Sequence, residues 1–137
     1  MADTVRKVSY RYTIIDNKAG EGFRLASTLR EAGVNLLAFS AFPTEPGKAQ
    51  AVMVPESEEA LLQVAKSKGI ELSPNKHAFL IEGADRPGAM AEILQKLSNA
   101  SLNVVATDAV CAGSGRFGCI LWVEPEDYDK AARALGA

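Results

Sequence analysis

The chain has 137 residues, of which 47% are hydrophobic and 23% charged, and its formal net charge is -2 from 15 basic and 17 acidic residues. This length predicts one domain, or two small copies packed together. The acidic excess and the absence of a lysine or arginine cluster argue against a general nucleic-acid binder. No apolar run is long enough for a membrane helix, and none follows the first charges as in a signal peptide, so we expect a cytoplasmic protein.

The first half alternates strand and helix patterns. Polar and apolar side chains alternate over residues 8–15, which predicts a strand. Asn17 has the residue type of a helix N-cap, and near-helical apolar spacing follows as far as Gly33, a typical stop. Residues 34–42 and 49–54 predict a hairpin around a turn rich in proline and glycine. A helix ending at about residue 68 and a short strand over 70–72 complete this half.

The second half repeats the same order. Residues 78–81 predict a strand, and Met90, Ile93 and Leu97 lie on the apolar face of a helix. Residues 102–111 and 118–123 predict a second hairpin, and a last helix opens at a proline. No strand pattern follows that helix, so we expect the second half to lack its fourth strand.

The two halves are in register at an offset of 68 residues. The offset pairs Gly20 with Gly88 and Asn35 with Asn103, and each pair falls at a predicted element boundary. At this offset the alternation of the first strand falls one residue out of step with that of residues 78–81. The repeat therefore does not decide which face of the first strand is buried. The order predicts an α+β fold of two ferredoxin-like βαββαβ repeats, 1–73 and 74–137, each an antiparallel sheet with its helices on one face.

The stretch Asp85-Arg86-Pro87-Gly88 stands at the first strand-to-helix turn of the second half. Asp85 can cap the helix, Pro87 fixes φ in the first turn, and Gly88 lets a backbone or a ligand approach. Free N–H groups at a helix start suit a carboxylate, and Asn103 offers both a donor and an acceptor. Purely structural roles for these residues, as a cap, a packing glycine and a turn residue, remain open.

With these residues in this order, the chain resembles the ACT domain family of small regulatory amino-acid-binding domains. The resemblance rests on the Asp85 turn with Ser101-Leu102-Asn103, and on Gly33-Val34-Asn35 in the first half, where Ala19 replaces the proline. Members of that family commonly bind an amino acid between two such domains. The resemblance therefore implies ligand contacts at Asn17, Gly20, Asn35, Asp85, Pro87, Gly88 and Asn103.

The resemblance implies a stand-alone regulatory protein and a homodimer, with an amino acid or similar small carboxylate as ligand and a regulated enzyme as a further partner. We expect no catalysis, no cofactor and no metal, because His77 is alone and the two cysteines lack a matching histidine. Cys111 and Cys119 flank a glycine-rich hairpin and could lie across from each other. The alternative is a purely structural interaction module that recruits a partner at an open sheet edge. An RNA-binding sheet would need more than the two tyrosines of the first strand.

Overall fold

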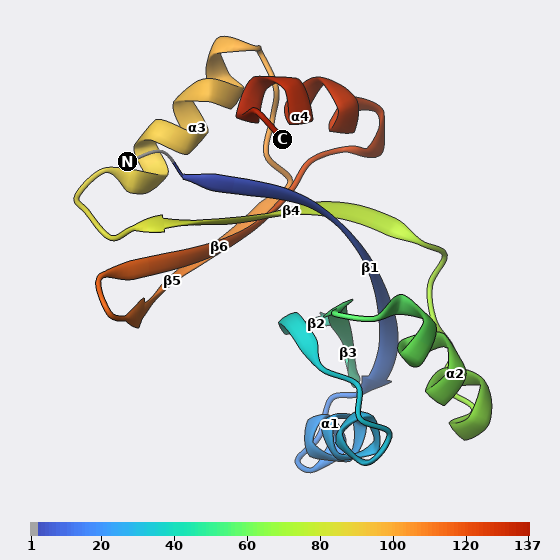
Figure 1. Cartoon of the computed structure of the whole chain (residues 1–137). Helices are drawn as coiled ribbons and strands as arrows, with labels where there is room; N and C mark the ends of the chain where they lie inside the picture. Colours follow the sequence, from blue (N-terminus) through green and yellow to red (C-terminus); the bar gives the residue numbers. More distant parts are fainter. Residues whose placement is uncertain (1–2) are drawn as a thin grey trace. The chain divides into compact units, whose positions relative to one another are not determined.

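The computed structural model describes residues 3–137; Met1 and Ala2, which the predicted first repeat includes, lie outside the described residues. The chain divides into two compact units (Figure 1). One is Ser9–Lys76, and the other is His77–Ala137 together with the described residues up to Val8. We call them the 9–76 unit and the 77–137 unit.

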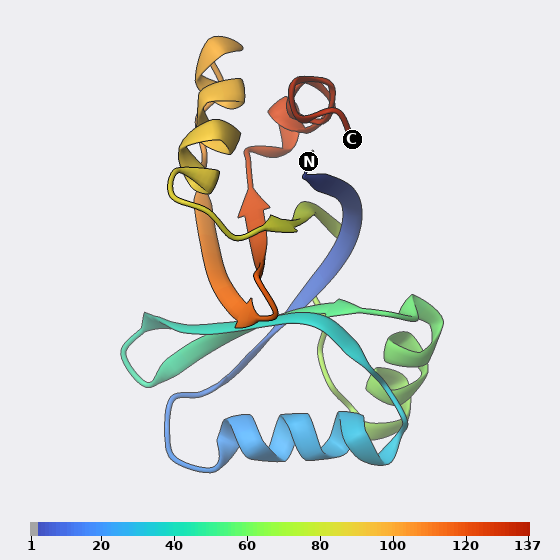
Figure 2. The same ribbon diagram turned by 60° about the vertical axis from the view of Figure 1, so that its left-hand side comes forward.

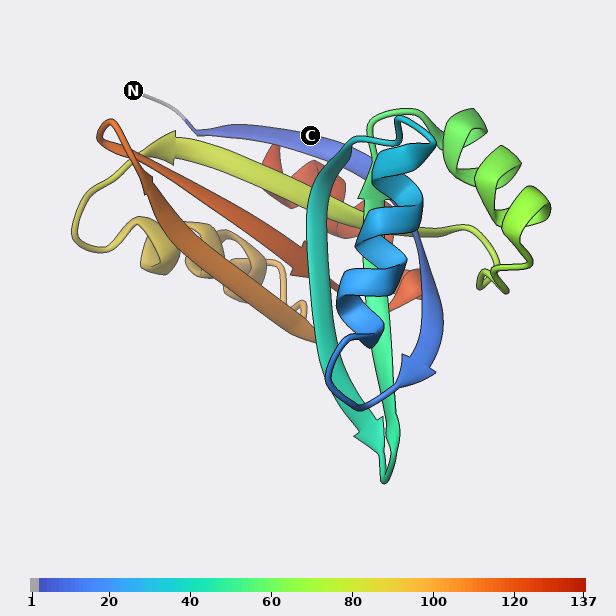
Figure 3. The ribbon, with the colours of Figure 1, turned by 90° about the horizontal axis from the view of Figure 1, so that it is seen from below.

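The 9–76 unit carries two helices on one face of a three-stranded sheet (Figures 2 and 3). Its strand order is β2-β3-β1, with both neighbouring pairs antiparallel. Leu29 of the first helix and Leu61 of the second share one core with Met53 of the central strand, so both helices cover the same face. Its elements are β1 (Thr4–Asp16, from Ser9 onwards), α1 (Glu21–Glu31), β2 (Leu36–Glu45), β3 (Lys48–Pro55) and α2 (Glu58–Lys68).

The register of β1 determines which of its side chains face these helices. Thr13 lies opposite Ala51, which belongs to the core beneath the helices, whereas Tyr12 lies opposite Val52 on the other face. At the offset of 68, Thr13 corresponds to Ile81, which is in the core of the 77–137 unit. The two first strands are therefore in step, and β1 directs its tyrosines away from its own helices.

The strand predicted over residues 70–72 is not formed. Residues 70–75 have no regular structure. Gly69 ends α2 in the left-handed conformation at φ 69°, and Pro74 has no N–H for a strand ladder. Ser73 still pairs with β1, because its N–H donates to the Tyr12 carbonyl at 2.8 Å.

The 77–137 unit has the strand order β1-β4-β6-β5, and Figure 1 shows α3 and α4 on one side of its strands. Phe79 and Leu121 of the sheet share a core with Leu97 of α3 and Leu135 of α4. Its elements are β4 (Lys76–Ala84), α3 (Ala89–Asn99), β5 (Ala106–Gly113), β6 (Arg116–Trp122), a short 3-10 turn (Pro125–Asp127) and α4 (Tyr128–Leu135).

The start of β1 takes the place of the strand that the second repeat lacks. β1 is the neighbour of β4, the residues up to Val8 belong to the 77–137 unit, and Val5 packs against its core. One strand therefore serves both units, its first residues in one sheet and its remainder in the other. The second repeat has no last strand of its own, as the sequence predicts, and the first residues of β1 fill that position.

The repeat holds at the level of single hydrogen bonds. Helices α1 and α3 begin 68 residues apart and end 68 residues apart. The N–H of Asn17 donates to the Gly47 carbonyl at 2.9 Å, and the N–H of Asp85 donates to the Gly115 carbonyl at 2.8 Å. In both units the turn before the helix is thus tied to the tip of the following hairpin in the same way.

Candidate functional site

Helices α1 and α3 each begin at a glycine rather than at a capping side chain. Gly20, at φ 92°, and Gly88, at φ 81°, are the N-caps, and neither helix has a side-chain cap. Only glycine adopts this left-handed conformation without strain. The interpretation of Asn17 and Asp85 as helix caps is wrong, because an intervening turn places the first helical residue beyond the reach of both side chains.

Asp85 contacts the β5–β6 hairpin rather than the start of α3. Its backbone N–H is bound to the Gly115 carbonyl, and its exposed carboxylate lies beside the thiol of Cys111. Hydrogen bonding to Asp85, with smaller contributions from burial and from the negative charge, raises the pKa of the Cys111 thiol. The pair keeps this cysteine protonated and therefore a poor nucleophile.

Arg86 links three parts of the 77–137 unit. Its Nη1 and Nη2 lie 3.1 and 3.2 Å from the two carboxylate oxygens of Asp3, and Nη2 lies 2.6 Å from Oε2 of Glu92. Nη1 also donates to the Ala84 carbonyl at 2.8 Å, and the guanidinium carbon lies 6.0 Å from the Phe117 ring centroid. Hydrogen bonds to Asp3 and then to Glu92 raise the pKa of Arg86. Its charge is thus balanced within the protein.

A cavity of about 250 Å³ lies between the start of α3 and the end of β5. Arg86 is the one charged residue in a lining that is otherwise mostly apolar. Because the protein's own carboxylates already hold that charge, the cavity is a weak site for a carboxylate as it stands. Its lining consists of Arg86, Gly88, Ala89, Met90, Ala91, Ala109, Val110, Cys111 and Phe117.

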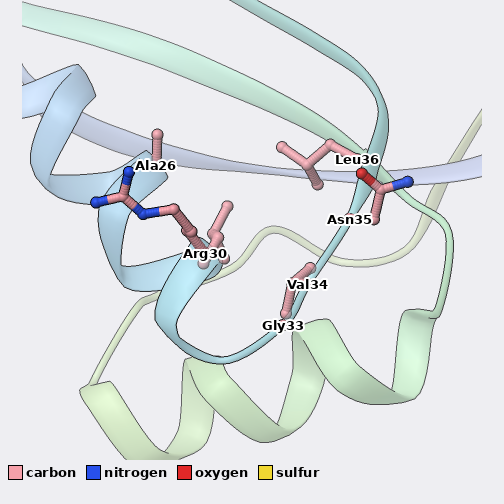
Figure 4. Close-up of a pocket in the computed structure, with 7 residues that line it drawn as sticks. Ala26, Arg30, Gly33, Val34, Asn35 and Leu36 are labelled. Atoms are coloured by element: carbon pink, nitrogen blue, oxygen red, sulfur yellow. The ribbon is translucent and has the colours of Figure 1, made fainter.

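A larger cavity, of about 370 Å³, lies where α1 ends and β2 begins (Figure 4). Arg30 lines it from the last turn of α1, and Asn35 lines it from the segment that leads into β2. Figure 4 shows these two side chains on different sides of the lining. The apolar part consists of Ala26, Leu29, Val34 and Leu36, and Gly33 completes the lining.

The side chain of each of the two polar residues of this cavity makes one long hydrogen bond. Arg30 donates one long bond, 3.5 Å, to the Ser27 hydroxyl, and it forms no ion pair within residues 3–137. The Asn35 amide nitrogen lies 3.4 Å from Oε2 of Glu56. Sequence reasoning selected Asn35 but missed Arg30, because a basic residue in the last turn of a helix is typical of helix termini in general. Its position three residues before Gly33 was the available signal.

The structure separates the candidate residues of each repeat into two groups. Asp85, Pro87 and Gly88 lie together at the start of α3, and Asn103 lies beyond the other end of that helix. A helix of 11 residues is about 16 Å long, so one small ligand cannot contact both groups within one repeat. Asn17 and Gly20 are separated from Asn35 by α1 in the same way. The side chain of Asn103 is exposed and makes no hydrogen bond within residues 3–137.

The cysteines are not positioned for a cross-strand disulfide. Cys119 lies opposite Ala109 and Cys111 lies opposite Phe117, so the two cysteines are diagonal neighbours rather than partners. Both are free thiols, with Cys111 exposed and Cys119 buried. Among the described residues, no group of three or more His, Cys, Asp and Glu side chains could hold a metal ion. None of the helices in residues 3–137 has the length and apolar character needed to cross a membrane.

No protein-family model and no curated protein matches this chain, but solved structures do. Protein BT0572 from Bacteroides thetaiotaomicron matches with a TM-score of 0.81 at 16% identity, over 96% of this chain and 88% of that one. The ligand-free regulatory subunit of aspartate kinase from Thermus thermophilus matches with a TM-score of 0.67 at 16% identity, over 99% and 95%. The regulatory subunit of aspartate kinase from Thermus flavus matches with a TM-score of 0.58 at 20% identity, over 99% of this chain and 95% of that one. The likeness confirms the predicted α+β fold of two ferredoxin-like repeats.

Proposed function

We propose that this chain is a regulatory ACT-type protein that binds an amino acid, or a similar small carboxylate, in the cavity beside Asn35. The observation that carries the proposal is the combination of Arg30 and Asn35 in one cavity of about 370 Å³. That volume lies within the range of about 300–1,000 Å³ that is typical of small-molecule sites. Its lining, mostly apolar with a few polar groups, is also of the usual kind.

The chemistry of the lining suits an amino acid. The Arg30 guanidinium has donors that no carboxylate of the described residues occupies, so it can take the ligand carboxylate. Asn35 can accept from an ammonium group or donate to a carboxylate. Leu29, Val34 and Leu36 provide an apolar wall for a side chain. The last carbonyls of α1 favour a positive charge, so we propose that the ligand ammonium lies near the helix end.

The remaining candidates enter the proposal as contacts from a second chain. Because the two groups of candidates in one repeat lie at opposite ends of a helix, a ligand bound at Asn35 or Asn103 reaches Asn17, Gly20, Asp85, Pro87 or Gly88 only if another repeat or another copy supplies them. We propose that another copy supplies them, which makes the binding unit at least a homodimer. It follows that the ligand should tighten the association of chains.

The structural neighbours support a regulatory role. Two of them are regulatory subunits of aspartate kinase, and the match to this chain covers 95% of each subunit. By analogy, we propose that this chain acts on a separate enzyme as its partner and is not itself an enzyme. We propose a cytoplasmic location, with which the free thiols agree.

A thermal-shift screen against the twenty amino acids tests the proposal. A ligand at 100 times its Kd should add about 2.7 kcal/mol of stability and raise Tm by several degrees. The shift should disappear in Asn35→Ala and persist in Asn99→Ala, a matched control at the exposed end of α3. Asn103→Ala then distinguishes the two repeats. Analytical ultracentrifugation with the hit should show a larger dimer fraction. A hit that survives unchanged in Asn35→Ala would place the site elsewhere.

The second candidate function is an interaction module without a small ligand. It is favoured by β2, an edge strand of the 9–76 unit, on which Phe39 and Phe42 are 45% and 41% exposed. Exposed aromatics on a sheet edge favour association with another chain. If no amino acid shifts Tm while Phe39→Ser lowers the oligomeric state, this function replaces the first.

A further inference from the structure

Glu56 contacts Asn35 through two hydrogen bonds. The backbone N–H of Glu56 donates to the Asn35 carbonyl at 2.9 Å, and the side-chain nitrogen Nδ2 of Asn35 lies 3.4 Å from Oε2 of Glu56. Glu56 belongs to the short connection between β3 and α2, whereas Asn35 leads into β2. The backbone bond keeps the two side chains adjacent, and the negative charge of the carboxylate strengthens the longer bond between them.

This contact determines which way the Asn35 amide faces. A carboxylate accepts hydrogen bonds but donates none, so the amide nitrogen is the atom that must face Glu56. In Figure 4 the amide oxygen of Asn35 lies on the side of Leu36, which also lines the cavity, and the amide nitrogen lies on the side away from it. The cavity therefore receives a hydrogen-bond acceptor from Asn35 rather than a donor.

The second repeat has the same two residue types without this contact. At the offset of 68, Asn103 corresponds to Asn35 and Glu124 corresponds to Glu56. The Asn103 side chain makes no hydrogen bond within residues 3–137, so its amide can turn and present either a donor or an acceptor. Of these two asparagines, the one with a fixed amide is the one that lines a cavity.

We propose that Glu56 is a positioning residue of the site beside Asn35, and that the acceptor it fixes there selects an aliphatic amino acid over a carboxylate that lacks the ammonium group. The ligand ammonium donates to the Asn35 amide oxygen, and the ligand carboxylate binds Arg30. A simple carboxylate has no donor for this oxygen and leaves it without a partner. The apolar wall of Leu29, Val34 and Leu36 suits an aliphatic side chain. This inference rests on the proposed function, because it assigns the contacts of the same site.

Nuclear magnetic resonance of the full chain tests the orientation of the amide without a ligand. In Glu56→Gln, the side-chain amide signals of Asn35 should move, because glutamine can donate to that amide as well as accept from it. Glu59→Gln is the matched control, since it removes the same charge from an exposed residue of α2 that contacts Gln63 instead. Asn35 signals that stay in place in Glu56→Gln would overturn the positioning role.

Isothermal titration with leucine and with isocaproate, which is leucine without its ammonium group, tests the selectivity. The unsubstituted protein should bind leucine at least about tenfold more tightly than isocaproate. In Glu56→Gln this ratio should fall several-fold, whereas Glu59→Gln should keep it. A purely structural effect of the substitution would weaken both compounds alike and would leave the ratio unchanged.

The outcomes separate this inference from the proposed function. Equal binding of the two compounds, or an unchanged ratio in Glu56→Gln, overturns the inference, and loss of binding in Asn35→Ala still supports the proposed site. Leucine binding that survives in Asn35→Ala overturns both. A protein that does not bind leucine overturns the assignment of an aliphatic ligand, and a thermal shift with another amino acid that depends on Asn35 then still supports the proposed function.

Discussion

Ser73 satisfies both backbone polar groups of Tyr12. Its N–H donates to the Tyr12 carbonyl at 2.8 Å, and its hydroxyl oxygen accepts the Tyr12 N–H at 2.9 Å. The hydroxyl in turn donates to the Pro74 carbonyl at 2.9 Å. A single residue, through its N–H and its hydroxyl, thus substitutes for the backbone ladder that a strand at residues 70–72 would have supplied along this edge of β1.

Replacing Ser73 with alanine should destabilise the protein. The Tyr12 N–H would lose its partner, and an unsatisfied buried donor costs about 1–3 kcal/mol. Urea denaturation followed by circular dichroism measures the loss. Ser67→Ala, at an exposed position on α2, is the control and should stay within about 0.5 kcal/mol of the unsubstituted protein. Equal stabilities for the two variants would show that water replaces the Ser73 hydroxyl at no cost.

Two neighbouring glycines of the first repeat should respond to alanine with opposite signs. Gly20 has φ 92° and open space where a Cβ would lie, so Gly20→Ala should cost about 1–2 kcal/mol through the backbone alone. Gly22 lies in the first turn of α1 and also has open space, so Gly22→Ala should stabilise by about 0.5–1 kcal/mol. Thermal unfolding of both variants checks the pair. The same sign for both would mean that α1 does not begin at Gly20.

The repeat explains why the sequence predicted so much of the fold. The glycines at 20 and 88 mark real helix starts, and the offset of 68 reproduces α1 in α3 residue for residue. Local patterns could not show two features. The first is that residues 70–72 have strand-like apolar character, but their apolar side chains are only partly buried against the core and form no strand. The second is that residues 4–8 join a sheet formed mostly by residues about 70 or more positions later. Which segment completes a sheet depends on long-range competition that periodicity does not contain.

The candidate site was harder to predict, for a geometric reason. Motif residues were grouped because they are close in a repeated pattern, but an 11-residue helix holds the two groups about 16 Å apart. The turn with the stronger motif, at Asp85, uses its cation to hold Asp3. Arg30, which lacks such a partner, belongs to no motif. Whether a cation is free for a ligand depends on its tertiary contacts, and sequence spacing does not reveal them.

The Arg86–Glu92 pair should contribute to the pH dependence of stability. Hydrogen bonding to Arg86, with its positive charge as a further cause, lowers the pKa of Glu92 below the ordinary 4.5. A lowered folded-state pKa stabilises the fold above the ordinary value, and this stabilisation is lost as the pH falls through the lower folded value. Stability measured from about pH 7 down to pH 3 should therefore fall less steeply in Glu92→Gln than in the unsubstituted protein. Glu31→Gln, at the exposed end of α1, should keep the original slope.

Cys111 should label slowly until Asp85 is changed. Asp85 raises the pKa of this thiol, so iodoacetamide at neutral pH should react with it more slowly than with a free cysteine. Asp85→Asn should increase the rate, and the pH at half-maximal rate should move down. Cys119 is buried and should remain unlabelled in the folded protein, which makes it an internal control. An unchanged pH profile in Asp85→Asn would mean that this carboxylate does not act on the thiol.

Arg30 should separate ligand affinity from stability. Its single 3.5 Å bond to Ser27 is exposed, so Arg30→Gln should change the free energy of unfolding by less than about 0.5 kcal/mol. If the guanidinium binds the ligand carboxylate, the same change should weaken binding by about 1.5–3 kcal/mol, roughly tenfold to more than a hundredfold in Kd. Isothermal titration with the amino acid identified by the screen measures the loss. Arg24→Gln on the same helix removes a charge outside the cavity and should leave Kd within about twofold. Equal weakening in both variants would indicate general charge attraction, and an unchanged Kd in Arg30→Gln would exclude the guanidinium as the carboxylate contact.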